Sequence, residues 1–339
     1  MNLFSFRAYR NSVPPGYTAV ALLPLSGNMA NLKANPIAIN NAAVVGGHAP
    51  DANGNIIATR WTLTSPRHLG TFGGASSNVF GINDIGATCG SADTADGSVQ
   101  AALWEGGLIR NLGTIFGATG SSVAYALVDG PNSAVFGISS DAAGMNRAVR
   151  WDNLVIQQLL QENHWVSSTA RAVGPNGFPA GSASLQSGPS VAVYWNPSPV
   201  LLNGLPGSSN AEVLAGRASG VMVGQSNTGS NTTYEAVFFQ EGVNAFPMQT
   251  IAGATASCAN GVNRHSVAVG EYTRSGGLRR GFVFARYGGA SMVDLSLLLT
   301  AGGPVTEILN AYDINDDGMI AALGRDANGN EVGVLLLPN

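Results

Sequence analysis

Three features of the sequence predict an all-β fold, a closed β-propeller of seven four-stranded blades. Two residue markers recur together about every 45 residues, each repeat holds four short strand signals, and the strand missing from the last repeat is found near the N-terminus. Repeats of this length with four strands are typical of propeller blades, whose radial repetition leaves only short sheet edges.

The first marker is an apolar, alternating strand that ends in a large side chain. The steps between successive ends are 43, 47, 44, 44, 45 and 52 residues. Because side chains alternate between the two faces of a strand, the shared register predicts that the aromatic ends are buried between adjacent blades and form no ligand surface. The ends are Trp61, Trp104, Trp151, Trp195, Phe239, Phe284 and Leu336.

The second marker is a glycine that closes a strand rich in valine and alanine. It follows the first marker along the whole chain, at Gly47, Gly90, Gly137, Gly181, Gly224, Gly270 and Gly324. Two independent series with one period indicate seven copies of a single structural unit.

Turn residues separate the strand signals within each repeat. Asp, Asn and Gly lie between apolar segments of four to six residues, as in β-hairpins. No segment keeps a 3.6-residue period, so we expect at most short helical turns, at Asn153–Glu162 and Leu295–Thr300. The strands expected in the second repeat are Val79–Asn83, Ala87–Gly90, Val99–Trp104 and Leu108–Leu112.

The two ends of the chain predict how the ring closes. The last repeat has only three strand signals, near Ala311–Asn315, Met319–Leu323 and Val332–Leu337, whereas Tyr17–Leu25 has the pattern of the missing fourth strand. We expect this N-terminal strand to complete the last blade, which hides edges that would otherwise aggregate. Residues 17–339 then form one propeller domain, preceded by an arm at 1–16.

The arm is the segment outside the repeats and carries the candidate partner-binding residues. Phe4, Phe6, Arg7, Tyr9 and Arg10 lie in an alternating apolar and polar pattern, as in an extended strand. Three aromatic side chains exposed so close together are an apolar liability on a monomer, which favours docking onto a protein partner by strand addition. The alternative is that the arm packs along an outer blade of its own ring.

The composition argues against several classes of function. Charged residues make up 11% of the chain, against about 25% in an average globular protein, and the net charge is −4. Lys33 is the only lysine and no basic block occurs, so we expect no nucleic-acid partner. The first twenty residues lack the apolar core of a secretory signal, and no run approaches the roughly 18 apolar residues of a membrane span.

Catalytic motifs are not found, and we predict that the protein is not an enzyme. The chain has no G-x-S-x-G elbow, and its four histidines, interpreted as turn or surface residues, are dispersed at His48, His68, His164 and His265. Propeller hydrolases draw carboxylates from several blades into the axial mouth, but no pair stands out here. The glutamates are Glu105, Glu162, Glu212, Glu235, Glu241, Glu271 and Glu307.

Metal sites and cofactors are not predicted either. Asp313–Gly318 matches the first half of a calcium loop, but Gly324 stands where the bidentate glutamate is required. The same turn recurs at Gly81–Gly86, which indicates a repeat feature instead. Cys89 and Cys258 are too few for a zinc site of the usual kind and lie about four blades apart, so we expect two free, buried thiols.

Four short motifs follow one another in the second repeat. They are L-G-T-F-G-G at Leu69–Gly74, G-I-N-D-I-G at Gly81–Gly86, A-A-L-W at Ala101–Trp104 and N-L-G-T at Asn111–Thr114. This unit resembles that of the bacterial extracellular-repeat (HAF) proteins, as do the C-terminal stretches VDLSLLLTAGG, AYDINDDGMIAALG and VGVLLLPN. No unit keeps the histidine that the family places before its Ala–aromatic pair. The resemblance implies the propeller fold and no particular activity.

Three functions are consistent with these observations. The first is a non-enzymatic binding or structural module, such as a phage virion component of the tail or surface that mediates assembly or host attachment. The second is a secreted or cell-surface protein for adhesion or glycan binding, and the third is a glycan-active hydrolase or lyase. Low charge, the absent signal and the arm favour the first, which places the protein in a virion or outside a cell, with a protein or a surface glycan as its partner.

Overall fold

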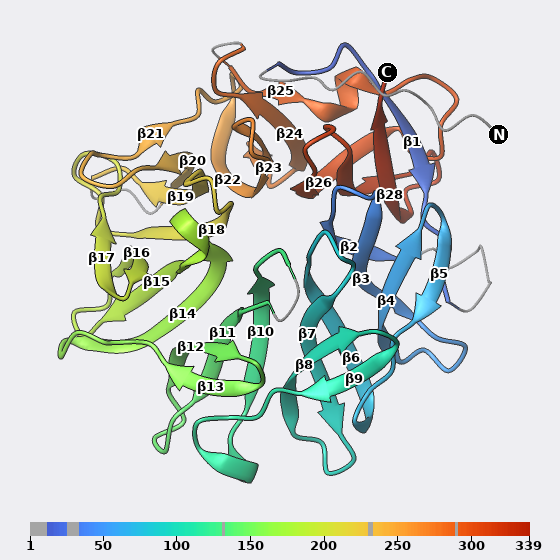
Figure 1. The fold of residues 1–339 in the computed structure, drawn as a ribbon. Coiled ribbons are helices and arrows are strands. Elements are labelled where there is room, and N and C mark those ends of the chain that lie inside the picture. Colours follow the sequence, from blue (N-terminus) through green and yellow to red (C-terminus); the bar gives the residue numbers. More distant parts are fainter. Residues whose placement is uncertain (1–11, 26–33, 131–132, 230–232, 289–290) are drawn as a thin grey trace.

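The computed structural model shows seven four-stranded antiparallel sheets arranged in a ring (Figure 1), which confirms the predicted seven-bladed propeller. The structure describes residues 12–339 except 26–33, 131–132, 230–232 and 289–290. The arm residues Phe4, Phe6, Arg7, Tyr9 and Arg10 therefore lie outside the described residues.

Each blade runs from an inner strand at the ring axis to an outer strand at the rim. Blade 1 contains β2 (Asn35–Ile39), β3 (Val44–Pro50), β4 (Ile56–Thr62) and β5 (Ser65–His68). Blade 2 contains β6 (Gly73–Ile82), β7 (Thr88–Thr94), β8 (Val99–Glu105) and β9 (Leu108–Asn111). Blade 3 contains β10 (Ser122–Leu127), β11 (Val135–Ser140), β12 (Asn146–Asp152) and β13 (Val155–Gln158).

The second half of the ring repeats this order. Blade 4 contains β14 (Trp165–Val173), β15 (Pro179–Leu185), β16 (Ser190–Asn196) and β17 (Ser198–Leu202). Blade 5 contains β18 (Ala211–Gly216), β19 (Met222–Asn227), β20 (Tyr234–Phe239) and β21 (Phe246–Pro247). Blade 6 contains β22 (Ala254–Val262), β23 (Val267–Arg274), β24 (Arg279–Ala285) and β25 (Val293–Asp294), and blade 7 contains β26 (Glu307–Ile314), β27 (Ile320–Arg325), β28 (Glu331–Pro338) and β1 (Tyr17–Ala21).

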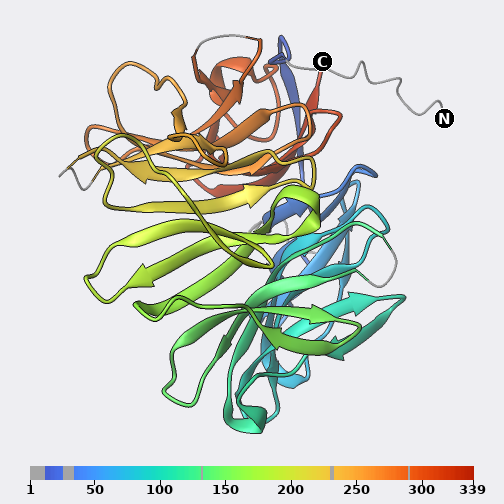
Figure 2. The same cartoon turned by 60° about the vertical axis from the view of Figure 1, so that its left-hand side comes forward.

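The N-terminal strand closes the ring as predicted. β1 pairs antiparallel with β28, from Tyr17 opposite Pro338 to Ala21 opposite Val334. Figures 1 and 2 both place β1, in blue, beside β28, in red. Consecutive inner strands are in contact all around the axis, including β26 with β2, so the last blade meets the first.

One expected helical turn forms and the other does not. Leu295–Leu298 is a short 3-10 helix, whose start is capped by the Asp294 carboxylate through the Ser296 amide. The segment 153–162 forms no helical turn and instead contributes strand β13. Asn153 and Leu154 both take positive φ values, as a tight hairpin turn requires, and they fold β13 back onto β12.

The predicted aromatic series forms the core between blades. Trp61, Trp104, Trp151, Trp195, Phe239 and Phe284 are all buried, and none exposes more than 7% of its surface. Trp61 of blade 1, for example, packs against Met319 and Ala321 of blade 7. The large side chains of the third strands therefore contribute to the apolar contact between neighbouring sheets.

The glycine series has a steric cause. In blades 1 to 6 the marker glycine lies on the second strand, directly beside a carbonyl oxygen of the inner strand. A Cβ on Gly90 would overlap the carbonyl oxygen of Asn78, well inside the 3.0 Å that real Cβ contacts respect. A side chain is thus excluded at these positions, and the Val/Ala-rich strand has to carry glycine there.

Removing residues 1–26 deletes β1 and should leave blade 7 with an open edge on β28. We expect the truncated protein to form aggregates and to lose the wild-type melting transition, measured by size-exclusion chromatography and thermal unfolding. Removing residues 1–12 spares β1 and is the matched control. A monomer that lacks 1–26 and melts at the wild-type temperature would contradict this mode of closure.

Gly90→Ala should lower the free energy of unfolding by about 2–3 kcal/mol, because the added methyl group meets backbone that cannot move away. Gly303→Ala is the control, since the nearest atom to a Cβ there, the Thr300 carbonyl oxygen, is 3.6 Å away. Urea denaturation of both variants measures the difference. Equal stabilities would show that the inner strand can adjust to a side chain.

Candidate binding site in the axial channel

An irregularity in every inner strand builds the axial channel. Each inner strand has a β-bulge, at which one residue is left out of the pairing with the second strand. Bulges bend a strand and redirect the side chain of the extra residue. The extra residues that line the axial cavity, one from each blade, are Ile37, Phe80, Tyr125, Arg171, Leu214, Asn260 and Tyr312.

Four inner strands, β6, β14, β22 and β26, have a second irregularity in their pairing. In β26 the two bulges lie at Leu309 and at Tyr312. Leu309 is buried, so Tyr312 takes the channel position. The seven extra residues enclose a cavity of about 290 Å³, whose wall is completed by their neighbours on the inner strands.

Three of the channel side chains form a continuous stack on blades 2, 3 and 4. The rings of Phe80 and Tyr125 lie 5.4 Å apart at an interplanar angle of 54°. The guanidinium carbon of Arg171 lies 5.4 Å from the centre of the Tyr125 ring, within the range of a cation–π interaction. Burial raises the pKa of Tyr125, and the nearby Arg171 charge opposes part of that rise. Arg171 is exposed to the channel yet held in one direction.

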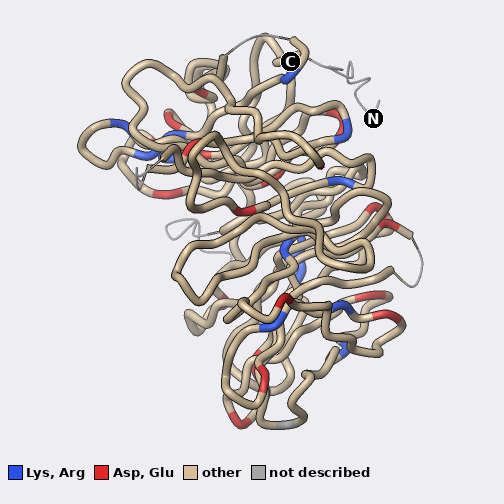
Figure 3. Tube along the Cα trace, turned by 90° about the vertical axis from the view of Figure 1, so that its left-hand side faces the viewer, with Lys and Arg blue, Asp and Glu red and all other residues tan. Residues whose placement is uncertain are grey.

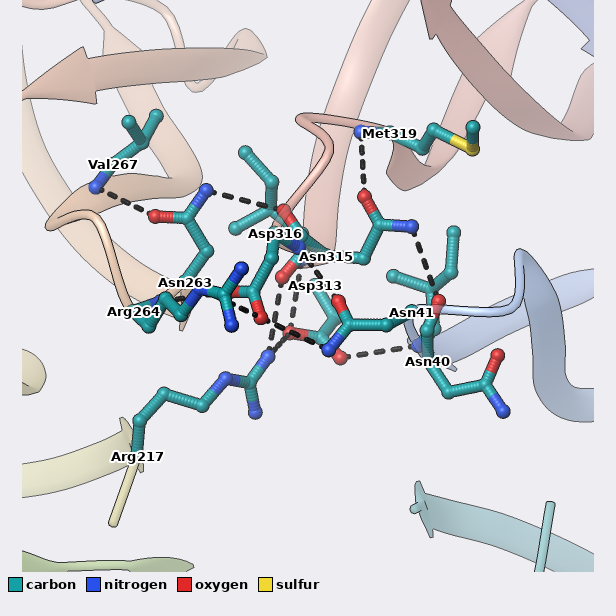
Figure 4. Close-up of polar contacts among 12 residues, drawn as sticks. Asn40, Asn41, Arg217, Asn263, Arg264, Val267, Asp313, Asn315, Asp316 and Met319 are labelled. Atoms are coloured by element: carbon teal, nitrogen blue, oxygen red, sulfur yellow. Dashed lines mark hydrogen bonds and ion pairs between the residues drawn. The ribbon is translucent and has the colours of Figure 1, made fainter. Parts of the chain in front are cut away.

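A second arginine of the cavity wall, Arg217, points toward Asp313 (Figure 4). Arg217 follows β18 in blade 5, and its guanidinium reaches past blade 6 to the Asp313 carboxylate of blade 7 at 3.1 Å and to the Ile314 carbonyl at 3.1 Å. The other Asp313 oxygen accepts the Ile39 amide of blade 1 at 3.0 Å. Burial raises the pKa of Asp313, and Arg217 and the two backbone amides oppose the rise. The pair ties blades 5, 7 and 1 together.

Asparagine side chains also link neighbouring blades. The side-chain amide of each asparagine donates to a backbone carbonyl oxygen of the next blade, at 2.9 to 3.3 Å. The bonds run from Asn263 to Asn315, from Asn315 to Asn40, from Asn40 to Asn83 and from Asn83 to Val128. Each bond crosses from one blade to the next, from blade 6 to blade 3. Each Asn side-chain oxygen also accepts backbone amides of its own turn, as with Asn315 and the Met319 amide at 2.9 Å. Asn315 is therefore committed to the turn, which supports the repeat interpretation of Asp313–Gly318.

The next residue of each turn forms a second relay. The backbone amide of Asp316 donates to the side-chain oxygen of Asn41 at 2.9 Å. The backbone amides of Asn41 and Asp84 donate in the same way to the carboxylates of Asp84 and Asp129, each at 2.9 Å. The Arg264 amide donates to Asp316 at 3.0 Å. These acidic side chains thus bridge neighbouring turns.

Acidic residues and a thiol gather near the channel on blades 5 and 6. Burial raises the pKa of Cys258 to about 12, and the charges of Glu271 and Glu212 add to the rise. The thiol donates to the Asn260 side-chain oxygen at 3.0 Å, and Asn260 in turn donates to Asn310 at 2.8 Å. Glu212 accepts from Gln225, and Glu271 pairs with Arg279, each at 3.3 Å. The sequence had not singled out these two glutamates as neighbours.

The cysteines and histidines are placed partly as predicted. Both thiols are free, and Cys89 is fully buried, but Cys258 is only half-buried because its strand faces the axis. His68 and His164 are exposed and His265 lies in a turn. His48 was expected in a turn or on the surface and instead lies half-buried within β3, where burial lowers its pKa and Nε2 is 3.2 Å from the Asn35 amide nitrogen.

Charged side chains are sparse over the ring (Figure 3). Within the described ranges, no group of three or more His, Cys, Asp or Glu side chains is placed to hold a metal ion. In the same part of the chain, no helix has the length and apolar character needed to cross a membrane.

No protein-family model matches the chain, and no curated protein matches its sequence. Similar solved structures include a puromycin-hydrolysing peptidase from Mycobacterium tuberculosis (11% identity, TM-score 0.56, 96% of this chain and 54% of that one). TolB from Acinetobacter baumannii has 12% identity and a TM-score of 0.45, and the match covers 74% of this chain and 61% of TolB. A gluconolactonase from Xanthomonas campestris has 11% identity and a TM-score of 0.37, and the match covers 96% of this chain and 99% of that one. The chain spans about half the length of the peptidase and three-fifths of TolB. At these identities the likeness is one of fold alone.

Arg217→Gln should lower the free energy of unfolding by about 1–2 kcal/mol at pH 8, less than for a fully buried pair because Arg217 is 35% exposed. The loss should shrink on acidification, since protonated Asp313 no longer needs the cation. Because burial raises the pKa of Asp313, the change should begin above its ordinary value of 3.8. Denaturation from pH 8 to pH 4 measures it.

Arg264→Gln is the control for this pair, since Arg264 is 59% exposed and lies 3.5 Å from Asp316. We expect a change below about 0.5 kcal/mol for that variant. A pH-independent effect of Arg217→Gln would show that the arginine acts through packing and not through its charge.

Proposed function

We propose that the protein is a non-enzymatic binding and structural module that presents its axial channel to a ligand. The observation that carries this proposal is the set of seven bulge residues that line the cavity, one from each blade, which we call the channel belt. Concave sites with a few polar groups on a rigid scaffold are the usual places for ligands. Fixed hydrogen bonds and ion pairs around the belt supply that rigidity.

A place in a larger assembly, such as the tail or surface of a phage particle, is the second part of the proposal. The low charge of the chain and its N-terminal arm support it. The arm residues Phe4, Phe6, Arg7, Tyr9 and Arg10 would attach the ring to a protein partner, and the channel would remain open for host attachment. A secreted or cell-surface adhesion protein would use the channel in the same way.

A glycan-active enzyme is the alternative that one observation favours. Glu212 and Glu271 both lie near Cys258, and burial raises the pKa of Glu271, as is expected of a general acid. However, Glu271 is paired with Arg279 and Glu212 with Gln225, so both carboxylates are already engaged within their own blades. Glycan turnover that Glu271→Gln abolishes would establish this alternative.

Leu214→Trp tests the binding function because the larger ring would fill the channel from blade 5. We expect the variant to lose glycan-array binding or host attachment while its melting temperature stays close to that of the wild type. Leu201→Trp is the matched control, since Leu201 is 52% exposed on the outer strand of blade 4. Equal binding by both variants would remove the channel from the function.

Deletion of residues 1–12 separates the two parts of the proposal. If the arm attaches the ring to a particle, the shortened protein should fail to co-purify with that particle and should still bind the ligand of the channel. Normal incorporation of the shortened protein would remove the arm from the proposal and leave the channel unaffected.

A further inference from the structure

Arg171 differs from the other charged residues of the channel wall. The wall contains two arginines and one aspartate, and Arg217 and Asp313 neutralise each other. No carboxylate within the described part of the chain lies within ion-pair distance of Arg171, although the side chain is exposed to the cavity. Arg171 is therefore the charged group of the cavity wall that has no ion-pair partner among the described residues, in a protein of net charge −4.

The direction of this arginine is set before any ligand arrives. Its guanidinium lies over the Tyr125 ring, and Tyr125 is itself packed against Phe80. Because Arg171 is the extra residue of the β14 bulge, its backbone is also fixed by pairing on both sides, at Ala170 and Ala172. A pre-organised guanidinium loses little entropy on binding and offers paired N–H donors to a planar anion.

We propose that Arg171 captures the carboxylate of an acidic sugar, of the uronic acid class, in the axial channel. This inference rests on the proposed binding function and names its ligand. A single carboxylate balances the one free charge of the wall, whereas a doubly charged phosphate would leave a net negative charge among apolar neighbours. The cavity of about 290 Å³ suits a single sugar ring.

The rest of the wall suits the remainder of such a sugar. Ile37 and Phe80 of blades 1 and 2, and Leu214 of blade 5, supply apolar surface that the C–H groups of the sugar would contact. The Asn260 side chain is held by Cys258 and Asn310, so it is a fixed polar group beside the cavity. The channel thus combines a cation without an ion-pair partner, apolar side chains and a fixed amide, which together suit a charged amphipathic ring.

Calorimetric titration of the full chain with sodium glucuronate, glucose and inorganic phosphate tests the proposal. We expect glucuronate to bind and to weaken as salt is added, and glucose to bind at least tenfold less tightly. Arg171→Gln should reduce glucuronate affinity at least tenfold, and Arg171→Lys should do so less, because lysine keeps the charge but not the planar donors. The melting temperature of each variant checks that it is folded.

Arg286→Gln is the matched control. Arg286 also lies over aromatic rings, 4.8 Å from the centre of Phe246 and 5.7 Å from that of Tyr287, but outside the channel. Its variant should bind glucuronate as the wild type does. Loss of binding in Arg286→Gln, or none in Arg171→Gln, would overturn the assignment of the site.

The other outcomes separate this inference from the proposed function. Equal affinity for glucose and glucuronate would overturn the carboxylate specificity and leave a ligand channel in place. Tighter binding of phosphate would assign Arg171 to a phosphate group instead. If none of the three compounds binds while Leu214→Trp still abolishes glycan-array binding, the acidic sugar is wrong and the channel function stands. If Leu214→Trp also has no effect, both are wrong.

Discussion

Six of the seven blades depend on one close approach, between a carbonyl oxygen of the inner strand and a glycine of the second strand. In blades 1 to 6 no Cβ fits at that point, as at Gly90 beside the Asn78 carbonyl. The approach occurs next to the bulge of the inner strand, where one residue leaves the pairing. In blades 1 to 6 the same local geometry therefore explains the glycine series and the direction of the channel side chains, whereas Tyr312 of blade 7 lies at a second bulge. The bulge turns a repeated sheet into a scaffold that can hold seven different residues around one axis.

Cohesion between the blades has an apolar and a polar part. The large side chains of the third strands fill the space between neighbouring sheets all around the ring. The asparagine relay is confined to the arc from blade 6 through blade 7 to blade 3. In blades 4 and 5 the equivalent turns begin with Gly174 and Arg217. Arg217 reaches instead to Asp313, so an ion pair connects blade 5 to the arc of asparagines.

The charged groups in and beside the channel differ in how they are paired. Glu212 and Glu271 have partners in their own blades, and Asp313 is bound by Arg217 and by two backbone amides. A carboxylate with such partners is a structural group first. Arg171 is different, because its contact is an aromatic ring, which orients the cation without neutralising it. This cation is the basis of the proposed anion binding in the channel.

The sequence by itself determined the number of blades, the burial of Trp61 and its counterparts, and the closing role of Tyr17–Ala21. These features follow from the repeat period and from the alternation of apolar and polar residues, both of which are visible in the linear sequence. It also marked the N-x-x-G turn as a repeat feature, although not the hydrogen bonds that its asparagine makes to the next blade. The sequence left 153–162 open to a helical turn, because a leucine at positive φ, as at Leu154, is rare and its residue type does not reveal it.

Only the tertiary structure decided which side chains meet at the axis. Five of the channel residues lie ten positions before the marker glycine of their blade, so the sequence did contain a positional signal. They are Ile37, Phe80, Arg171, Leu214 and Asn260. Their chemical types differ, however, and a bulge has no fixed residue preference at its extra position. Pairs such as Arg217 and Asp313, 96 residues apart, come together because the ring closes. Sequence period fixes how a blade is built, whereas the closure of seven blades fixes which residues of different blades touch.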